Sequence, residues 1–200
     1  MKRVYIICSL AVLLGIAGGI SFFLIRDANA AIPANTTFIT QNGETFNFGK
    51  DKTKLKLIEF IYTHCPDVCP TTTQKMVDLK KDLLKKGIYG KDIEFVTITI
   101  DPYRDTTAIL QEYKQGFGIK NDNNWLFLTG EKQQITESQK QLHKITDALQ
   151  FQYKDPGNGQ FIHSTFTYLV DENNKFIAKF PMGTEFNKQD VYNKIIDKIE

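Results

Sequence analysis

The stretch FIYTHCPDVCP, residues 60–70, decides the fold because it joins the end of an apolar strand to the start of a helix through two cysteines. Cys65 and Cys69 are the only cysteines outside the N-terminal apolar segment. Four residues make about one helical turn, so the two Cα atoms can lie within the roughly 4.4–6.8 Å that a disulfide needs. Two sulfurs at this spacing can equally hold a soft metal ion. The spacing therefore predicts either a redox pair or a metal site.

Pro70 predicts where the helix begins. Proline is favoured at the first helical position and restricts the residue before it, so we expect the helix to start at Pro70 with Cys69 as its N-cap. A thiolate there would lie at the positive end of the helix, which lowers the pKa of a cysteine below its free value of about 8.5. The thiolate both attacks disulfides and binds metal, so both alternatives remain open.

The rest of the chain alternates predicted strands and helices. Runs of β-branched and aromatic residues predict buried strands, and apolar residues at helical spacing predict helices between them. The order strand, helix, strand, helix implies a sheet with a parallel core. We expect a hairpin at 38–48 around Asn42-Gly43 and strands at 55–62, 93–100, 125–128, 161–170 and 175–180. We expect helices from Pro70 to Gly87, after Thr106 to Gly116 or Gly118, and at about 131–149 and 187–199.

The N-terminal segment predicts export. Lys2 and Arg3 precede an apolar run of 22 residues, 4–25. At about 1.5 Å per residue this run exceeds the roughly 30 Å hydrocarbon core of a bilayer, and it is longer than the 7–15 apolar residues usual in a signal peptide. We therefore favour a membrane anchor that spans residues 1–30, followed by a linker at 31–37 and one domain at 38–200. The positive flank keeps the short tail cytoplasmic and the domain outside.

Ala28-Asn29-Ala30 leaves a cleaved signal segment as the alternative, because small residues at this spacing fit a cleavage site. Cys8 lies inside the apolar run and is interpreted as an apolar helix residue.

The charge of the domain argues against a nucleic-acid partner. Residues 31–200 contain 22 Lys and Arg and 22 Asp and Glu, so the domain is neutral. No basic patch indicates nucleic-acid binding. About 170 residues is the size of one domain with an ordinary core.

Four separated motifs carry a family resemblance. The segments THCPDVCP (63–70), IDPYRDT (100–106), FLTG (127–130) and HSTFTYLVD (163–171), in this order, resemble the Sco/SenC family of membrane-tethered copper proteins needed to assemble cytochrome c oxidase. The resemblance covers roughly residues 38–196. It implies an α/β, thioredoxin-like fold with a central mixed sheet and an added N-terminal hairpin, preceded by one transmembrane helix. Thioredoxins have two residues between their cysteines, whereas this chain has three.

The resemblance also implies a ligand set. Cys65, Cys69 and His163 would bind one copper ion, Cu(I), Cu(II) or both, received from a copper donor protein and delivered to the binuclear copper centre of cytochrome c oxidase subunit II. Copper chemistry agrees, since thiolates select Cu(I) and imidazole suits either state. Many family members carry an acidic residue immediately before this histidine, where the chain has Ile162. Asp67 and Asp101 are nearby candidates for a supporting carboxylate.

Other interpretations of the same residues remain. Cys65 and Cys69 fit a structural disulfide, or the redox-active pair of a thiol-disulfide oxidoreductase that reduces the cysteines of the oxidase copper site. A redox or copper sensor is a third possibility. We favour the metallochaperone, in a bacterial inner membrane with the domain facing the periplasm or cell exterior; the mitochondrial inner membrane is the alternative. Outside the ligand set we place His64, His143 and Met76, the last on an apolar helix stripe.

Overall fold

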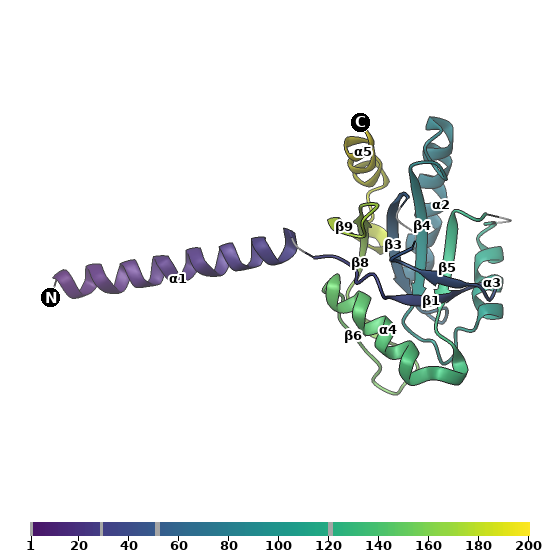
Figure 1. The fold of residues 1–200 in the computed structure, drawn as a ribbon, viewed down its shortest axis with the longest axis horizontal. Helices are drawn as coiled ribbons and strands as arrows, with labels where there is room; N and C mark the ends of the chain where they lie inside the picture. Colours follow the sequence, from purple (N-terminus) through teal and green to yellow (C-terminus); the bar gives the residue numbers. More distant parts are fainter. Residues whose placement is uncertain (1, 29, 51–52, 120–121) are drawn as a thin grey trace. The chain divides into compact units, whose positions relative to one another are not determined.

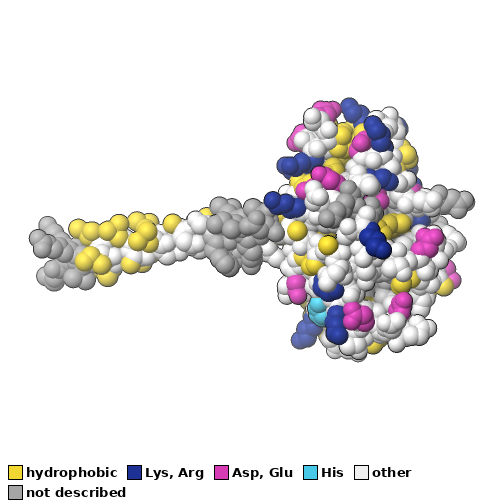
Figure 2. Space-filling view, viewed as in Figure 1, with side chains coloured by type: hydrophobic (Ala, Val, Ile, Leu, Met, Phe, Trp, Pro, Cys, Tyr) yellow, Lys and Arg dark blue, Asp and Glu magenta, His cyan; other side chains and the backbone are white. Residues whose placement is uncertain are grey.

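The computed structural model describes residues 2–28, 30–50, 53–119 and 122–200, without the side chains of 2–4, 22–28 and 132. The chain divides into two units, Met1–Ala30 and Ala31–Glu200, each drawn in Figure 1. The first unit is a helix, α1 (Lys2–Ala28), where the sequence predicts one. Its side chains over 5–21 are exposed and largely apolar (Figure 2). A search of the described residues finds no helix with both the length and the hydropathy of a membrane span.

The second unit is built on a mixed sheet. Seven strands lie in the order β2-β1-β5-β4-β3-β8-β9, with β3, β4 and β5 parallel and the other pairs antiparallel. This order confirms the central mixed sheet with an added hairpin. The strands are β1 (Thr37–Thr40), β2 (Thr45–Asn47), β3 (Leu55–Ile61), β4 (Ile93–Thr99), β5 (Trp125–Thr129), β8 (Phe166–Val170) and β9 (Phe176–Pro181).

The central strands form the core. Every residue of β3 and β4 is buried, as expected for parallel strands covered on both faces. The helices are α2 (Val68–Lys86), α3 (Thr107–Gly116), α4 (Ile135–Ala148) and α5 (Lys188–Ile199), with short 3-10 turns η1 (Lys132–Gln134) and η2 (Gly183–Glu185). Helix α2 packs beside α5, and α3 packs on β5, as Figure 1 shows; α4 contacts β1.

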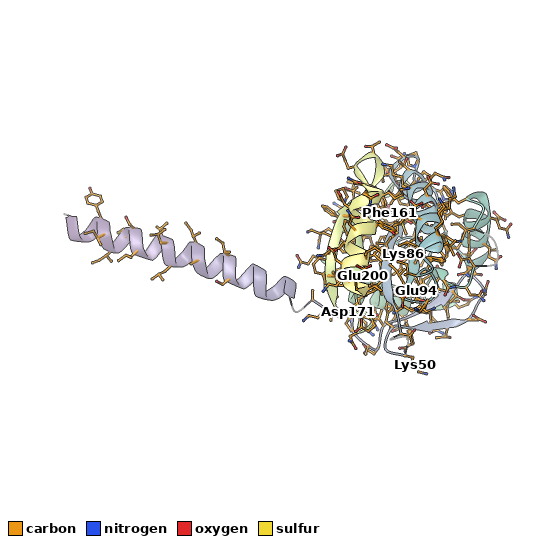
Figure 3. All side chains as sticks on the ribbon, turned by 90° about the horizontal axis from the view of Figure 1, so that it is seen from above. Lys50, Lys86, Glu94, Phe161, Asp171 and Glu200 are labelled. Carbon is orange, nitrogen blue, oxygen red and sulfur yellow. The ribbon has the colours of Figure 1, made fainter. Side chains whose placement is uncertain are left out.

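Local signals account for several element ends. Gly43 adopts a φ of +83° in the turn between β1 and β2, a conformation that glycine tolerates best. Gly87 ends α2 with a φ of +77° and donates its N–H to Leu84, as the sequence predicts. Asn187 caps α5 by accepting the N–H of Gln189. Lys86 at the end of α2 pairs with Glu200 at 3.6 Å, and both are labelled in Figure 3.

One expected strand is divided in two. Residues 161–170 were predicted as a single strand, but β7 (Ile162–His163) pairs with β6 (Tyr153–Lys154) in a separate two-stranded sheet. Only β8 joins the main sheet. Ser164 pairs with the hairpin and not with the main sheet, since its N–H donates to Gln152 O at 2.8 Å and its hydroxyl accepts the Gln152 N–H at 2.9 Å. His163 therefore belongs to a hairpin beside the main sheet.

The stretch expected as a linker, residues 31–37, has contacts with the domain. Ala31 forms a β-bridge with Lys175, and Ile32 is 3% exposed and donates its N–H to Asn174. Thr36 is buried, and β1 begins at Thr37.

Candidate metal centre

Three side chains from distant parts of the chain form one cluster. The Sγ atoms of Cys65 and Cys69 and a ring nitrogen of His163 all lie within 4.8 Å of one another. Cys69 is completely buried, Cys65 is 8% exposed and His163 is half-buried. The two cysteines are free, with no disulfide between them. Within the described ranges, this is the only group of three His, Cys, Asp or Glu side chains close enough to share a metal ion.

Cys65 lies in the turn between β3 and α2, and Cys69 lies in the first turn of α2. The backbone N–H of Cys65 donates to Tyr62 O at 3.0 Å, and that of Cys69 donates to Cys65 Sγ at 3.5 Å. The helix begins at Val68, so the prediction that it starts at Pro70 with Cys69 as the N-cap was wrong. Pro70 is tolerated within the first turn because N–H groups there have no helical acceptor. The Cys65 sulfur still lies at the helix N-terminus.

His163 is oriented from the hairpin. Its Nδ1 lies 2.8 Å from Ser164 O, so a proton on Nδ1 donates there and leaves Nε2 as the metal-binding nitrogen. Phe151 stacks on the imidazole at 5.9 Å between ring centroids, and Tyr62 meets it edge-on at 5.9 Å. These contacts restrict the ring to one orientation facing the cysteines.

The three groups differ in protonation. Hydrogen bonds from Cys69, His163 and the backbone N–H groups of Asp67 and Cys69 to the Cys65 sulfur outweigh its burial and lower its pKa to about 4. The same hydrogen bond, together with burial, raises the pKa of Cys69 far above its usual value. Burial opposes ionisation of His163, but its contacts with Cys65 and Ser164 raise its pKa. At neutral pH the pair is therefore one thiolate and one thiol.

A buried carboxyl lies beneath the cysteine helix. Glu59 of β3 is completely buried, and this burial raises its pKa to about 8 although Thr73 and Thr97 bond to it. Thr73 Oγ1 lies 3.1 Å from Glu59 Oε1 and 3.0 Å from Cys69 O. The carboxyl is thus neutral at pH 7 and adds no negative charge next to the Cys65 thiolate.

The other candidate residues lie outside the cluster. His64 is exposed beside Thr63, and His143 is exposed and stacks on Tyr153. Asp67 is exposed, whereas Asp101 is buried and bonds to Arg104. Met76 is completely buried, which confirms its placement in the core, and Met182 is 3% exposed.

Two site residues were missed by sequence reasoning. Glu59 had a readable signal, since it is an acidic residue in a strand that is otherwise mostly apolar and buried. Tyr62 hydrogen-bonds to Cys65, and its own pKa is raised by burial and by the charge of that thiolate. No local pattern distinguishes this tyrosine from an ordinary core residue.

Comparison with known proteins gives one consistent result. The model of a family described as SCO1/SenC matches residues 26–200. The chain is 40% identical over 162 residues to a SCO2-like protein of Rickettsia conorii, an alignment that covers 78% of this chain and 72% of the relative.

Solved structures share the fold. A SCO1/SenC family lipoprotein from Bacillus anthracis superposes with a TM-score of 0.73 and 28% identity, covering 86% of this chain and 96% of that one. Yeast Sco1 with copper bound superposes with a TM-score of 0.66 and 25% identity, covering 84% and 88%.

Proposed function

Because the chain belongs to the SCO1/SenC family, we propose that it is a membrane-tethered copper chaperone. It binds one copper ion through Cys65, Cys69 and His163 and delivers it to the binuclear copper centre of cytochrome c oxidase subunit II. The observation that carries the proposal is the convergence of these three donors within 4.8 Å, from a helix N-terminus and a separate hairpin. Copper is the cargo of this reaction.

The donor chemistry supports copper. Two sulfurs and one imidazole form a trigonal set, and thiolates select Cu(I) over the harder divalent ions. Cys65 is already a thiolate at neutral pH, while Cys69 holds a proton. Metal binding displaces that proton, so the affinity for Cu(I) increases as the pH rises. The neutral Glu59 avoids a third negative charge near the two sulfurs.

The three donor side chains are buried to different extents, which supports the transfer of copper to an acceptor protein. Cys69 is completely buried and Cys65 is 8% exposed, so the half-buried His163 is the donor that an acceptor reaches most easily. We infer that the acceptor first replaces the histidine.

The tether is proposed from composition. Residues 4–25 form a largely apolar run of 22 residues within α1, and at about 1.5 Å per residue this run is longer than the roughly 30 Å hydrocarbon core of a bilayer. With Lys2 and Arg3 on the cytoplasmic side, the domain over 38–200 lies on the periplasmic or outer side of a bacterial inner membrane.

An anaerobic Cu(I) titration of the full chain against a competing chelator tests the proposal. We expect one tightly bound copper, weakened roughly 100-fold in His163→Ala, which corresponds to about 3 kcal/mol. Binding is abolished in Cys65→Ser/Cys69→Ser. Cys8→Ser is the matched control and leaves the affinity unchanged. Equal, weak binding by the native chain and His163→Ala would refute the chaperone.

A thiol-disulfide oxidoreductase is the second candidate, and the unequal pair supports it. Cys65 is the more exposed and the more acidic sulfur, so its thiolate attacks the disulfide of a client protein. One client sulfur leaves as a thiolate. Cys69 then loses its proton and attacks the mixed disulfide, releasing the second client thiol. This activity needs both cysteines but not His163, so disulfide exchange retained in His163→Ala distinguishes it from metal delivery.

A further inference from the structure

Arg104 is the one arginine in residues 31–200, which contain 21 lysines. A chain that uses lysine at every other basic position of its domain has an arginine here. Arginine differs from lysine in its planar fork of donors, which can bind two acceptors at once in a fixed geometry. Arg104 uses two of these donors, Nε and Nη2, on two different acceptors.

The guanidinium joins two segments. Its Nε donates to Asp101, and its Nη2 donates to Gly159 O at 3.0 Å. Asp101 is fixed in turn, since it is 2% exposed and its N–H donates to Thr99 Oγ1 at 2.9 Å. Gly159 lies four residues before His163, in the loop between β6 and β7. Arg104 thus ties the end of β4 to the hairpin that carries His163.

The loop is shaped to receive this contact. Gly159 has a φ of +84°, and a Cβ there would lie 3.3 Å from Arg104 Nη1. The guanidinium carbon lies 5.9 Å from the centroid of the Phe161 ring, which is labelled in Figure 3. That ring lies 5.3 Å from Tyr62, whose ring contacts His163. A continuous set of contacts connects Arg104 with the imidazole.

Asp105, one residue further, holds the other half of the cluster. It is completely buried and accepts the Thr63 N–H at 3.0 Å and the Thr63 hydroxyl at 2.5 Å. Thr99 Oγ1 donates to it at 2.5 Å. Thr63 lies two residues before Cys65, at the start of the cysteine turn.

We propose that the segment from Asp101 to Asp105, which we call the bracket, holds the cysteine turn and the histidine hairpin in a fixed position relative to each other. These are the two halves of the metal cluster. Asp105 positions the cysteine turn and Arg104 positions the histidine hairpin; neither touches the metal. The proposal rests on the ligand set given above, and it adds two positioning residues to that set. The halves are held unequally, because the Arg104 side chain is 35% exposed while Asp105 is completely buried. The bracket therefore releases the histidine more readily than the cysteines.

Hydrogen exchange of the metal-free, reduced full chain tests the bracket without copper. In Arg104→Ala, we expect amides of residues 157–163 to exchange roughly 10-fold faster, the ratio produced by losing about 1.4 kcal/mol of hydrogen bonding. Arg104→Lys keeps the positive charge but loses the contact with Gly159 O. We therefore expect the hairpin amides of this variant to exchange almost as fast as those of Arg104→Ala. Lys179→Ala removes another cation from an aromatic ring, that of Phe166, and is the matched control without effect on the hairpin.

Thr63→Val tests the other half. Loss of its hydroxyl bond to Asp105 speeds exchange of the amides of residues 62–65 by roughly 5-fold and leaves the hairpin unchanged. Hairpin exchange that is the same in native protein and Arg104→Ala would overturn the proposal, whether or not the chain binds copper.

A double-mutant cycle then ties the bracket to His163. Arg104→Ala lowers the Cu(I) affinity roughly 10-fold in the native background and leaves it unchanged in His163→Ala, because its effect requires the imidazole. An equal loss in both backgrounds would mean that Arg104 acts elsewhere, and the bracket would be wrong. If the native chain binds no copper, the proposed function fails, while the exchange experiment still decides the bracket.

Discussion

The two halves of the cluster are built differently. The cysteine turn connects β3 and α2, where the preceding strand is buried along its whole length and pairs with a neighbour on each side. The histidine hairpin has two residues in each strand, β6 and β7, and half-exposed or exposed side chains. The cysteine turn is part of the core, whereas the histidine hairpin lies at the surface of the core.

Because of this difference, we expect the cysteine turn to determine the folding stability and the histidine hairpin to determine how readily the metal is exchanged. Substitutions at the cysteine turn disturb packed core residues, and we expect large losses of folding free energy there. Substitutions in the hairpin change few buried contacts, so they alter metal binding at little cost in stability. A delivery protein with this division can move one ligand while its fold stays intact.

The largest test of this contrast is Phe60→Ala. Phe60 is completely buried, and its ring lies 4.3 Å from Phe151 and 5.9 Å from Tyr168. Removing it leaves a cavity that lowers the free energy of unfolding by about 4 kcal/mol. Phe161→Ala, in the half-exposed hairpin, is the matched variant and costs less than about 1 kcal/mol. Urea denaturation measures both, and similar losses would contradict the division.

Glu59→Gln tests the electrostatics of the cysteine half. The pKa of Glu59 rises from 4.5 to about 8 in the folded protein because the carboxyl is buried. Unfolding between these values releases a proton, so the native stability falls as the pH rises through this window and is level above it. Glutamine cannot ionise, so the fall in stability between pH 5 and 8.5 becomes smaller by about 4 kcal/mol in this variant. Urea denaturation of the native protein and of Glu59→Gln at pH 5 and 8.5 measures this difference. If the stability of the two proteins changed with pH in parallel, the conclusion that burial raises the pKa of Glu59 would be refuted.

His163→Ala tests communication between the halves. The imidazole is one of the donors that lower the pKa of Cys65 to about 4, although the Cys69 thiol contributes most. Alkylation of Cys65 by iodoacetamide should reach its plateau above about pH 5 in the native protein, because the thiolate is the reactive form. The midpoint moves to higher pH in His163→Ala. Peptide mapping separates Cys65 from Cys8 and Cys69; an unchanged midpoint would contradict this contact.

The smallest effect is expected for Ile162→Asp. Ile162 is 67% exposed beside His163, so its replacement changes the free energy of unfolding by less than about 0.5 kcal/mol. A carboxylate there lies one residue from His163, on the opposite face of β7, and its negative charge raises the pKa of the imidazole further. An NMR titration of the imidazole measures that shift, and thermal unfolding measures the stability. A loss of several degrees in Tm would show that the hairpin is more tightly packed than proposed.

Local sequence patterns predicted most of the elements. The apolar runs at 55–62 and 93–100 became β3 and β4, and Asn42-Gly43, Gly87 and Asn187 lie at turns or helix ends as expected. These features depend on residues close in sequence, so periodicity and turn chemistry are enough to find them. The start of α2 was missed by two residues, because hydrogen bonding to Cys65 Sγ favours a helical Cys69 despite Pro70.

The sequence by itself determined the cysteine pair, because four residues of spacing on one turn bring two sulfurs together with little help from the rest of the chain. It also determined that the domain is neutral and that α1 is an apolar helix. Only the tertiary structure decided that His163 leaves the main sheet, that burial keeps Glu59 protonated, and that Arg104 reaches Gly159, 55 residues away. These features depend on contacts between residues far apart in sequence, and burial and hydrogen bonding across such distances leave no periodic signal in the chain.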